Sequence, residues 1–344
     1  MTGTLTLDGS AASAPVSALS GPPPAEAGAP ALVVEDLSVR RGSVYLVEST
    51  SLSVAKGETL CLVGESGCGK SLTCTAMMGL TDAPLAAEGS IRVLGREISG
   101  LPERRLNGVR GRDVAMIFQD PMAALNPIQR VGAQVAEILS VHGEASPKER
   151  RREVLALFER VGLPDPERQA RAYPHQLSGG MCQRVMIAMA IACRPRILIA
   201  DEPTTALDVT IQAQILRLLR ELQDETGMAM IFVTHDLGVV AEIADRVAVM
   251  YSGRVVEEAG VDEIFDAPRH PYTRALMACR VGTGQPGTVL PAITGSVPAP
   301  SARPAGCVFA PRCDHAGPPC LVRPQLKTRM SGARVACHLG EGSA

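Results

Sequence analysis

The sequence predicts an α/β fold built around a mostly parallel sheet, with a phosphate-binding loop at the end of one strand. Short aliphatic or β-branched runs alternate with helical patterns over most of the chain, which is the arrangement that produces parallel sheets. The run at residues 59–63 leads into a glycine-rich loop and then into a helix-compatible segment. A second run, at residues 197–200, ends in two carboxylates, a residue type that holds metal ions beside bound phosphates.

Composition narrows the class of protein. The chain has 344 residues, of which 46% are hydrophobic, so one large or two modest domains with a sizeable core are expected. The formal net charge is −2, from 34 basic and 36 acidic residues, and this balance predicts no nucleic-acid partner. No segment approaches the roughly 20 apolar residues of a bilayer span. Because no Lys or Arg precedes Arg40, we expect no signal peptide and a cytoplasmic chain.

The first part of the chain contains most of the predicted strands. Residues 1–30 are rich in Ala, Ser, Gly and Pro and are predicted to be disordered. A helix is expected at residues 71–80, directly after the glycine-rich loop. The strands are expected at residues 32–39, 51–54, 59–63, 91–94 and 113–118. The last of these is largely apolar, and we expect it to be a central strand.

The middle of the chain changes to a helical pattern, from residue 120 to about residue 172. Residues 131–141 and 147–161 have the spacing of amphipathic helices. We expect these helices, over about residues 120–180, to form a helical insertion between two parts of a sheet domain.

The next part returns to the sheet pattern. Strands are predicted at residues 196–200 and 228–233, and a hairpin at residues 246–256 around Ser252-Gly253. Asp208 is a good N-cap for a helix at residues 209–223. The apolar residues of that helix fall at helical spacing and predict a core stripe, made of Ile211, Ile215, Leu218, Leu219 and Leu222.

The glycine-rich loop fits the pattern G-x-x-x-x-G-K-[ST]. It consists of Gly64, Glu65, Ser66, Gly67, Cys68, Gly69, Lys70 and Ser71. In this motif the glycines let consecutive backbone N–H groups point at phosphate oxygens, the lysine reaches the β- and γ-phosphates, and the serine hydroxyl ligates Mg²⁺. The loop predicts ATP and Mg²⁺ as cofactors, against the alternative of an ordinary glycine-rich turn.

Two further stretches carry groups suited to the same site. Asp201 fits a Mg²⁺ ligand and Glu202 a general base that polarises the attacking water, although many strands simply stop at an Asp in a turn. Ser178, Gly179 and Gly180 precede a helix and form a second possible anion-binding terminus, with a plain helix N-cap as the alternative.

Four cysteines cluster near the end of the chain, at Cys307, Cys313, Cys320 and Cys337. In a cytosolic protein such a cluster favours metal or iron–sulfur ligation over disulfides. The spacing lacks the paired C-x₂-C of common zinc folds. Four thiolates suit a [4Fe–4S] cluster or a tetrahedral Zn²⁺ ion, and unligated thiols are the third possibility.

Taken with the loop and the carboxylates, residues 177–183 (Leu-Ser-Gly-Gly-Met-Cys-Gln) make the chain resemble the ATP-binding subunit of an ABC transporter, over residues 32 to 340. The resemblance implies the P-loop ABC nucleotide-binding fold, with residues 1–30 as a disordered segment, 31–281 as the ATPase domain and 282–344 as a C-terminal extension. It implies that two such subunits pair head to tail. Ser178, Gly179, Gly180 and Gln183 would then serve an ATP held by the partner's loop.

The resemblance also assigns roles to single residues. Gln119 corresponds to the residue that touches Mg²⁺ and water and links to the membrane subunit, and Asp208 to the loop that crosses the dimer. His235 corresponds to the switch histidine at the γ-phosphate. Each of these residues has a structural alternative, as a polar strand end, a helix cap or a surface histidine. For adenine stacking, Tyr45 is the nearest aromatic residue, and Arg41 is the alternative.

Three segments resemble the dipeptide/oligopeptide importer subfamily, namely residues 121–127, 185–190 and 270–276, and the Gly-Gly-Met start of the signature helix resembles its D-type member. This implies ATP hydrolysis that drives peptide import. It also implies an unlike second ABC ATPase, two membrane permeases, an extracytoplasmic substrate-binding protein and a peripheral location on the cytoplasmic face of the membrane.

Other readings stay open at this point. Some members of the subfamily carry a [4Fe–4S] cluster at the tail cysteines. Nickel and glutathione importers share much of the pattern, so they are alternative functions. A non-transport ABC ATPase and a stand-alone P-loop kinase are the rivals from other classes, and the serine–glycine–glycine signature argues against the kinase.

Overall fold

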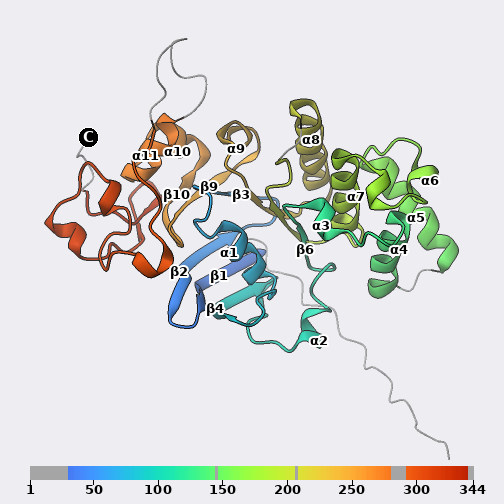
Figure 1. Ribbon diagram of the computed structural model, residues 1–344, viewed down its shortest axis with the longest axis horizontal. Helices are drawn as coiled ribbons and strands as arrows, with labels where there is room; N and C mark the ends of the chain where they lie inside the picture. The colour runs from blue at the N-terminus through green and yellow to red at the C-terminus, as the bar shows by residue number, and fades with distance from the viewer. Residues whose placement is uncertain (1–29, 144–145, 206–207, 280–291, 340–344) are drawn as a thin grey trace, which may run out of the picture.

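The computed structural model describes residues 30–143, 146–205, 208–279 and 292–339 (Figure 1). Residues 1–29 of the segment predicted to be disordered, and residues 282–291 at the start of the predicted C-terminal extension, lie outside this range. None of the helices in the described part of the chain combines the length and the apolar composition that a bilayer crossing requires.

The described residues form strands in two sheets. The strands are β1 (Leu32–Arg41), β2 (Val44–Val54), β3 (Thr59–Val63), β4 (Leu85–Val93), β5 (Arg96–Glu97), β6 (Val114–Ile117), β7 (Ile197–Asp201), β8 (Ala229–Val233), β9 (Arg246–Tyr251), β10 (Arg254–Gly260), β11 (Lys327–Thr328) and β12 (Arg334–Val335).

The helices lie between these strands, as the alternating pattern predicts. The α-helices are α1 (Lys70–Met77), α2 (Glu103–Leu106), α3 (Pro121–Ala124), α4 (Val131–His142), α5 (Pro147–Arg160), α6 (Pro166–Gln169), α7 (Gly179–Ile191), α8 (Val209–Thr226), α9 (Leu237–Ile243), α10 (Val261–Asp266) and α11 (Pro271–Ala278). The 3-10 turns are η1 (Pro174–Gln176), η2 (Pro300–Ala302), η3 (Ala310–Arg312) and η4 (Pro318–Leu321).

The larger sheet has the strand order β11-β12-β10-β9-β3-β8-β7-β6. The strands from β9 to β6 pair in parallel, and β10, β11 and β12 add an antiparallel end. The expected mostly parallel sheet is therefore present. The expectation that residues 113–118 form a central strand is wrong, because β6 is the edge strand. Its residues are all buried, since Ala115 and Ile117 pack in one core cluster and Val114 and Met116 in the other.

The smaller sheet is antiparallel, with the order β2-β1-β4-β5, and packs with α1 against one face of the larger sheet (Figure 1). Its strands β2 and β4 begin earlier than predicted, at Val44 and Leu85 rather than at residues 51 and 91. Half-exposed strands carry polar residues, and a bulge at Ser49, with φ of +46°, breaks the alternation that would have revealed β2. Both starts were therefore hidden in the sequence.

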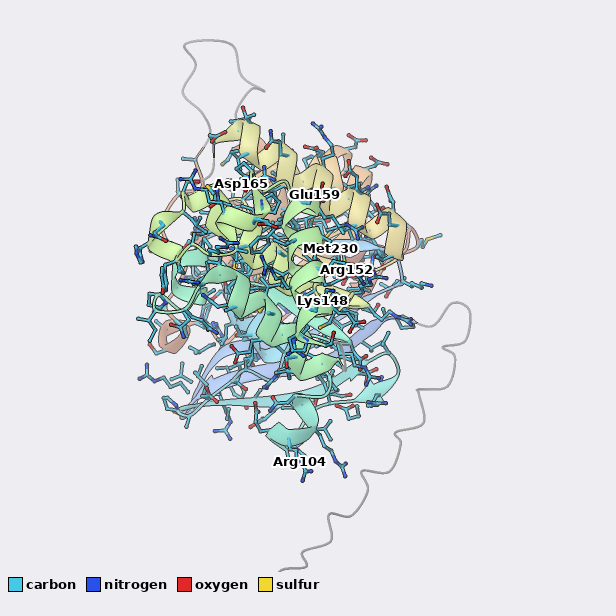
Figure 2. The ribbon with its side chains drawn as sticks, turned by 90° about the vertical axis from the view of Figure 1, so that its right-hand side faces the viewer. Arg104, Lys148, Arg152, Glu159, Asp165 and Met230 are labelled. Carbon is cyan, nitrogen blue, oxygen red and sulfur yellow. The ribbon has the colours of Figure 1, made fainter. Side chains whose placement is uncertain are left out.

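The segment between β6 and β7 contains helices α3 to α7, which lie together at one side of the molecule (Figure 1). Helix α5 begins at a capping box in which Ser146 and Glu149 bond each other's backbone N–H groups. It buries Val154, Leu157 and Phe158 and exposes its charged face, where Figure 2 labels Lys148, Arg152 and Glu159. The amphipathic pattern predicted this helix to within one residue at its C-terminal end.

The C-terminal part, residues 292–339, lies against α11 and β10 (Figure 1). Its strand β12 pairs with β10, and its Phe309 ring packs on the rings of Tyr251, Tyr272 and His270 at centroid distances of 5.2, 5.4 and 5.9 Å. This aromatic cluster joins the tail to the end of β9 and to the start of α11.

His270 in this cluster is fully enclosed, with 1% exposure, and its Nδ1 accepts a hydrogen bond from the Tyr272 backbone at 3.0 Å as the N-cap of α11. Burial lowers the pKa of His270 to about 3. The folded state therefore holds this imidazole neutral at any pH at which the protein is expected to work.

His270 should make the free energy of unfolding depend on pH. Its folded pKa lies below the value of about 6.5 in the unfolded chain, so the unfolded state binds more protons once the pH falls below 6.5. The stabilisation present above that pH is then lost, by about 1 kcal/mol per pH unit between pH 6 and 4. His270→Asn keeps a cap acceptor and should remove this part of the slope.

The measurement is urea unfolding of both chains at pH 6, 5 and 4. His175→Asn, the same substitution at an exposed histidine, is the control. Equal slopes for the parent and His270→Asn would contradict the prediction.

Candidate functional site

The predicted phosphate-binding loop connects β3 to α1 and depends on its glycines. Gly64 has φ of +152°, and a Cβ there would lie 2.1 Å from the Met250 carbonyl oxygen of β9. Gly69 has φ of +103°, and Gly67 has φ of +76°. Gly69 is the N-cap of α1 and supplies no side-chain acceptor, so the first N–H groups of this helix are left to an anion at the loop.

Lys70 is held inside the loop and is 5% exposed. Its Nζ donates hydrogen bonds to the carbonyl oxygens of Gly64, at 2.9 Å, and Glu65, at 3.1 Å. The loop thus curls around its own ammonium group, which is the positive charge that the motif predicts beside bound phosphates.

Two of the three predicted magnesium ligands, Ser71 and Asp201, meet although they are 130 residues apart in sequence, whereas Gln119, the third, contacts Glu202. The Ser71 hydroxyl donates to Asp201 Oδ1 at 3.0 Å. Asp201 is 3% exposed at the end of β7, and this burial raises the pKa of its carboxyl group. A hydroxyl and a carboxylate side by side are hard oxygen ligands, so these residues fit a Mg²⁺ ion.

Glu202 is the meeting point of the other predicted catalytic groups. Its Oε2 accepts a hydrogen bond from Gln119 Nε2 at 3.2 Å and lies 3.5 Å from His235 Nδ1. The Glu202 side chain is 13% exposed, whereas that of His235 is 63% exposed. The backbone of Glu202 is left-handed, with φ of +47°, which turns the chain sharply as it leaves β7.

Thr205 also contacts Glu202 and was missed by the sequence analysis. Its hydroxyl donates to the same Oε2 at 2.9 Å. A hydroxyl residue three positions after the carboxylate, just past the end of a predicted strand, is the local signal that could have found it.

The residues of the expected dimer face have roles within this chain, since Ser178 and Asp208 cap helices and Gln183 is buried in α7. The Ser178 hydroxyl accepts from the Met181 backbone N–H at 3.3 Å and caps α7, and Asp208 accepts from the Ile211 backbone at 3.0 Å and caps α8. Gln183 is 3% exposed, and its Nε2 finds no hydrogen-bond partner among the described residues. The roles of these residues toward ATP stay predictions.

The glycines of this segment are not required by the packing of the residues that the structure describes. Among those residues, a Cβ at Gly179 would meet no atom within 4 Å, and one at Gly180 would meet only the Ile211 side chain, at 3.5 Å. The segment therefore has open space in front of it.

On the adenine side, Tyr45 is 38% exposed in β2, and its stacking on a base, like that of Arg41, stays a prediction.

The four tail cysteines line a single cavity of about 190 Å³, together with His315 and His338. Burial raises the pKa of the Cys307, Cys313 and Cys337 thiols, so without a cation they are protonated. No group of three or more His, Cys, Asp or Glu side chains in the described ranges is already arranged to hold a metal ion. The donor set suits a metal centre, and the centre itself stays a prediction.

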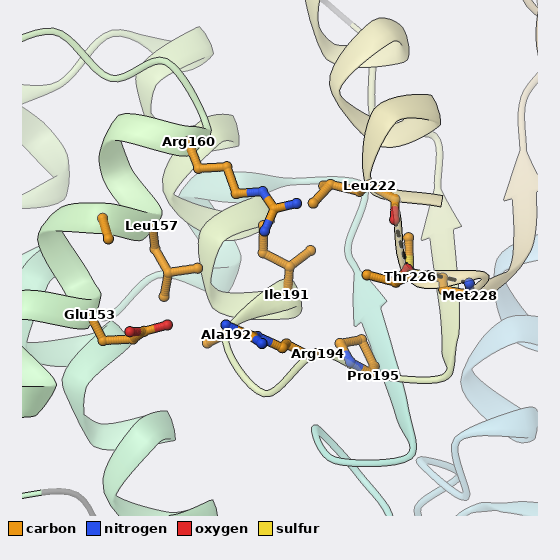
Figure 3. Close-up of a pocket in the computed structure, with 11 residues that line it drawn as sticks. Glu153, Leu157, Arg160, Ile191, Ala192, Arg194, Pro195, Leu222, Thr226 and Met228 are labelled. Carbon is orange, nitrogen blue, oxygen red and sulfur yellow. Dashed lines mark hydrogen bonds between the residues drawn. The ribbon is translucent and has the colours of Figure 1, made fainter. Parts of the chain in front are cut away.

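A different cavity, of about 230 Å³, lies between α5, α7 and α8 (Figure 3). Its walls include Leu157, Ile191 and Leu222, and Arg160 reaches across it. None of the predicted nucleotide residues lines it. The candidate site is therefore the edge of the sheet around the loop and Glu202, and not this cavity.

Two segments of this chain match models of known protein families. Residues 47–205 match the ABC transporter model, and residues 256–320 match the model of the oligopeptide/dipeptide transporter C-terminal region.

Individual relatives match over almost their whole length. The dipeptide transport ATP-binding protein DppD of Haemophilus influenzae is 49% identical over 314 residues, which cover 89% of this chain and 94% of the relative. DppD of Escherichia coli is 48% identical, covering 89% and 96%, and DppD of Bacillus subtilis is 47% identical, covering 88% and 91%.

Solved structures match the ATPase part. The dimeric post-hydrolysis state of the ATP-binding cassette MJ0796, bound to ADP and Pi, has a TM-score of 0.61 and 29% identity, covering 67% of this chain and 98% of that one. The cbiO1 protein of Clostridium perfringens, part of the ABC transporter complex cbiONQ, has a TM-score of 0.59 and 28% identity, covering 69% and 91%.

These matches confirm the predicted P-loop ABC ATPase fold and the resemblance stated from the sequence motifs. The chain belongs to the ABC transporter family of ATP-binding proteins, within the group that carries the oligopeptide/dipeptide transporter C-terminal region.

Proposed function

We propose that this chain is the ATP-hydrolysing subunit that powers a membrane importer of dipeptides or oligopeptides. The observation that carries the ATPase part is the convergence of Gln119, Thr205 and His235 on Glu202, next to the Ser71–Asp201 pair. The peptide substrate rests on the relatives that are named for dipeptide transport.

The residues suggest how hydrolysis proceeds. Bound Mg²⁺ would supply charge neutralisation at the phosphates, held by Ser71 and Asp201 with Gln119 nearby. The contacts from Gln119, Thr205 and His235 all reach Oε2 of Glu202, so we assign Oε1 to the attacking water. Glu202 then accepts the proton of that water as general base, while Lys70 and His235 stabilise the charge that develops on the γ-phosphate.

We further propose that the open segment Ser178–Gly180 faces the ATP of a second ABC ATPase. No described residue of this chain packs closely enough to require glycine at 179 or 180, and glycines at these positions leave room for the close approach of a partner's nucleotide. Asp208 and Gln183 lie at the start of α8 and within α7, where closure of a dimer would reach them or their helices. The partner is taken to be an unlike subunit.

In this proposal residues 31–281 are the ATPase domain, and helices α3 to α6 form its helical subdomain, over about residues 120–180. Gln119 lies directly between β6 and this helical part, so movement at the nucleotide passes into the helices. The helices would contact one of two permeases on the cytoplasmic face of the membrane. An extracytoplasmic protein would deliver the substrate.

The extension at residues 282–344 is proposed to hold a structural metal centre, a [4Fe–4S] cluster or a zinc ion, at Cys307, Cys313, Cys320 and Cys337. Support comes from their shared cavity. Bound metal would take the thiols as thiolates and cross-link turns η3 and η4 to the end of the chain.

Glu202→Gln should keep ATP binding and lower turnover by at least roughly 100-fold, because the amide cannot accept a proton from water. The ATP-bound dimer should then accumulate. Phosphate release and size-exclusion chromatography with MgATP measure the two effects on the chain combined with its partner ATPase. Glu221→Gln, an exposed change on α8, is the control. Undiminished turnover in Glu202→Gln would exclude Glu202 as the base.

The metal proposal predicts about four iron atoms, or about one zinc ion, in each chain purified without oxygen. Changing all four tail cysteines to serine should abolish this content, whereas Cys193→Ser, outside the tail, should leave it intact. Elemental analysis and thiol titration make the measurement. A metal-free chain with four titratable tail thiols would show that no metal centre is present.

The transport proposal predicts that the tagged chain, purified from detergent-solubilised membranes of its own cells, brings two polytopic permeases and a second ABC ATPase with it. Mass spectrometry identifies them, and loss of dipeptide uptake in cells carrying Glu202→Gln tests the substrate. Recovery of ribosomes or DNA-bound proteins without permeases would contradict the transport function. If the Glu202→Gln cells keep peptide uptake but lose nickel or glutathione uptake, the substrate is nickel or glutathione and not a peptide.

A further inference from the structure

An arginine from the C-terminal tail reaches the phosphate-binding loop. Arg312 lies at the end of turn η3, next to Cys313, and its Nη1 donates to Oε1 and Oε2 of Glu65 at 3.0 and 3.1 Å. The two residues are 247 positions apart in sequence. Glu65 is the second residue of the loop, so the tail and the loop are in direct contact.

The guanidinium group of Arg312 is enclosed, with 5% side-chain exposure. Its Nε donates to the Thr294 carbonyl at 2.7 Å and its Nη2 to the Ile293 carbonyl at 3.2 Å. It also lies over the Tyr251 ring, 5.8 Å from the centroid. The tail thus fixes the orientation of this group before it meets the loop, which favours a strong charge-assisted contact over a loose surface pair.

Glu65 is held at its backbone as well as at its side chain. Its N–H donates to the Tyr272 hydroxyl of α11 at 2.9 Å, and its carbonyl accepts from Lys70 Nζ at 3.1 Å. The backbone contacts come from the ATPase core. Among the described residues, Arg312 is the cation paired with the carboxylate.

The negative charge of the Glu65 carboxylate opposes the binding of an anion to the loop. A site for a polyanionic triphosphate gains from positive charge, and an unpaired negative charge in the same loop repels the ligand. Arg312 neutralises Glu65 and holds it away from an alternative pairing with Lys70, the ammonium that the loop needs for phosphate.

We propose that Arg312 is a positioning residue of the nucleotide site, which pairs the Glu65 carboxylate so that the loop presents Lys70 and its backbone N–H groups to phosphate. The C-terminal tail is then part of the ATP site and not only a docked extension. This inference rests on the proposed nucleotide site.

A purely structural role for the pair is the competing explanation, because other arginines also dock the tail. Arg334 pairs with Glu258 at 2.9 Å, and Arg323 pairs with Glu48 at 2.7 Å. These pairs join the same tail to the same core without contacting the loop. They therefore provide matched controls for the loss of one tail–core ion pair.

The test is MgADP binding to the full-length chain by isothermal titration calorimetry, since ADP is not consumed and carries the phosphates that the loop holds. Arg312→Met should raise the Kd on the order of tenfold, because Glu65 is left unpaired beside the ligand. Adding Glu65→Gln to Arg312→Met should restore the Kd to within about threefold of the parent chain. Arg334→Met should lower the melting temperature and leave the Kd unchanged.

The rescue separates the two explanations, because a docking defect is not repaired by neutralising Glu65. A raised Kd that Glu65→Gln does not restore, or an Arg312→Met chain with the parent Kd, would overturn the proposal. Arg312→Gln, whose amide nitrogen can keep only the contact that Nε makes to the Thr294 carbonyl, replaces Arg312→Met if that chain does not fold, with the same expected results.

Lys70→Ala separates failure of this inference from failure of the nucleotide site itself. Loss of MgADP binding in Lys70→Ala with normal binding in Arg312→Met would reject only the role of Arg312. Parent-like binding in Lys70→Ala would reject the proposed loop site, and with it this inference.

Discussion

Parallel pairing in the larger sheet is the constraint on which the site depends. Strands β3, β8, β7 and β6 are neighbours, and their carboxyl ends meet at one edge of the sheet. The register pairs Ile117 with Ala200 and Asp201 with Val233. Gln119, Glu202 and His235 each follow their strand within two residues, so this register alone brings them together. A shift of one residue in any pair would send one of these side chains to the wrong face.

The phosphate loop is shaped by parts of the chain that come much later. The Met250 carbonyl leaves no room for a Cβ at Gly64, and the Gly253 backbone N–H donates to the Cys68 carbonyl at 2.8 Å. Tyr272 and Arg312 then fix Glu65 from α11 and from the tail. The motif therefore locates the curled loop that is proposed to bind phosphate, and the hairpin β9–β10, helix α11 and the tail contact this loop and hold its shape.

Sequence patterns located most elements but failed in predictable places. Strands buried on both faces, such as β3 and β8, appear as continuous apolar runs and were found to within a residue. Strand β6 is also a continuous apolar run, so it was predicted to be central although it is an edge strand. Hydrophobicity shows that a strand is covered on both faces, and it does not show how many strands pair with it. The half-exposed strands β2 and β4 were found only in their buried parts, since bulges and polar residues hide the rest.

The sequence by itself determined what is local. It defined the loop of residues 64–71, the two carboxylates that end β7 and the cap of α8 by Asp208, because each depends on neighbours a few residues away. Tertiary structure alone decided which groups meet across the chain. The contact of Gln119 with Glu202 spans 83 residues, and that of Arg312 with Glu65 spans 247. Strand order and the path of the tail set such contacts, and no local pattern encodes either of them.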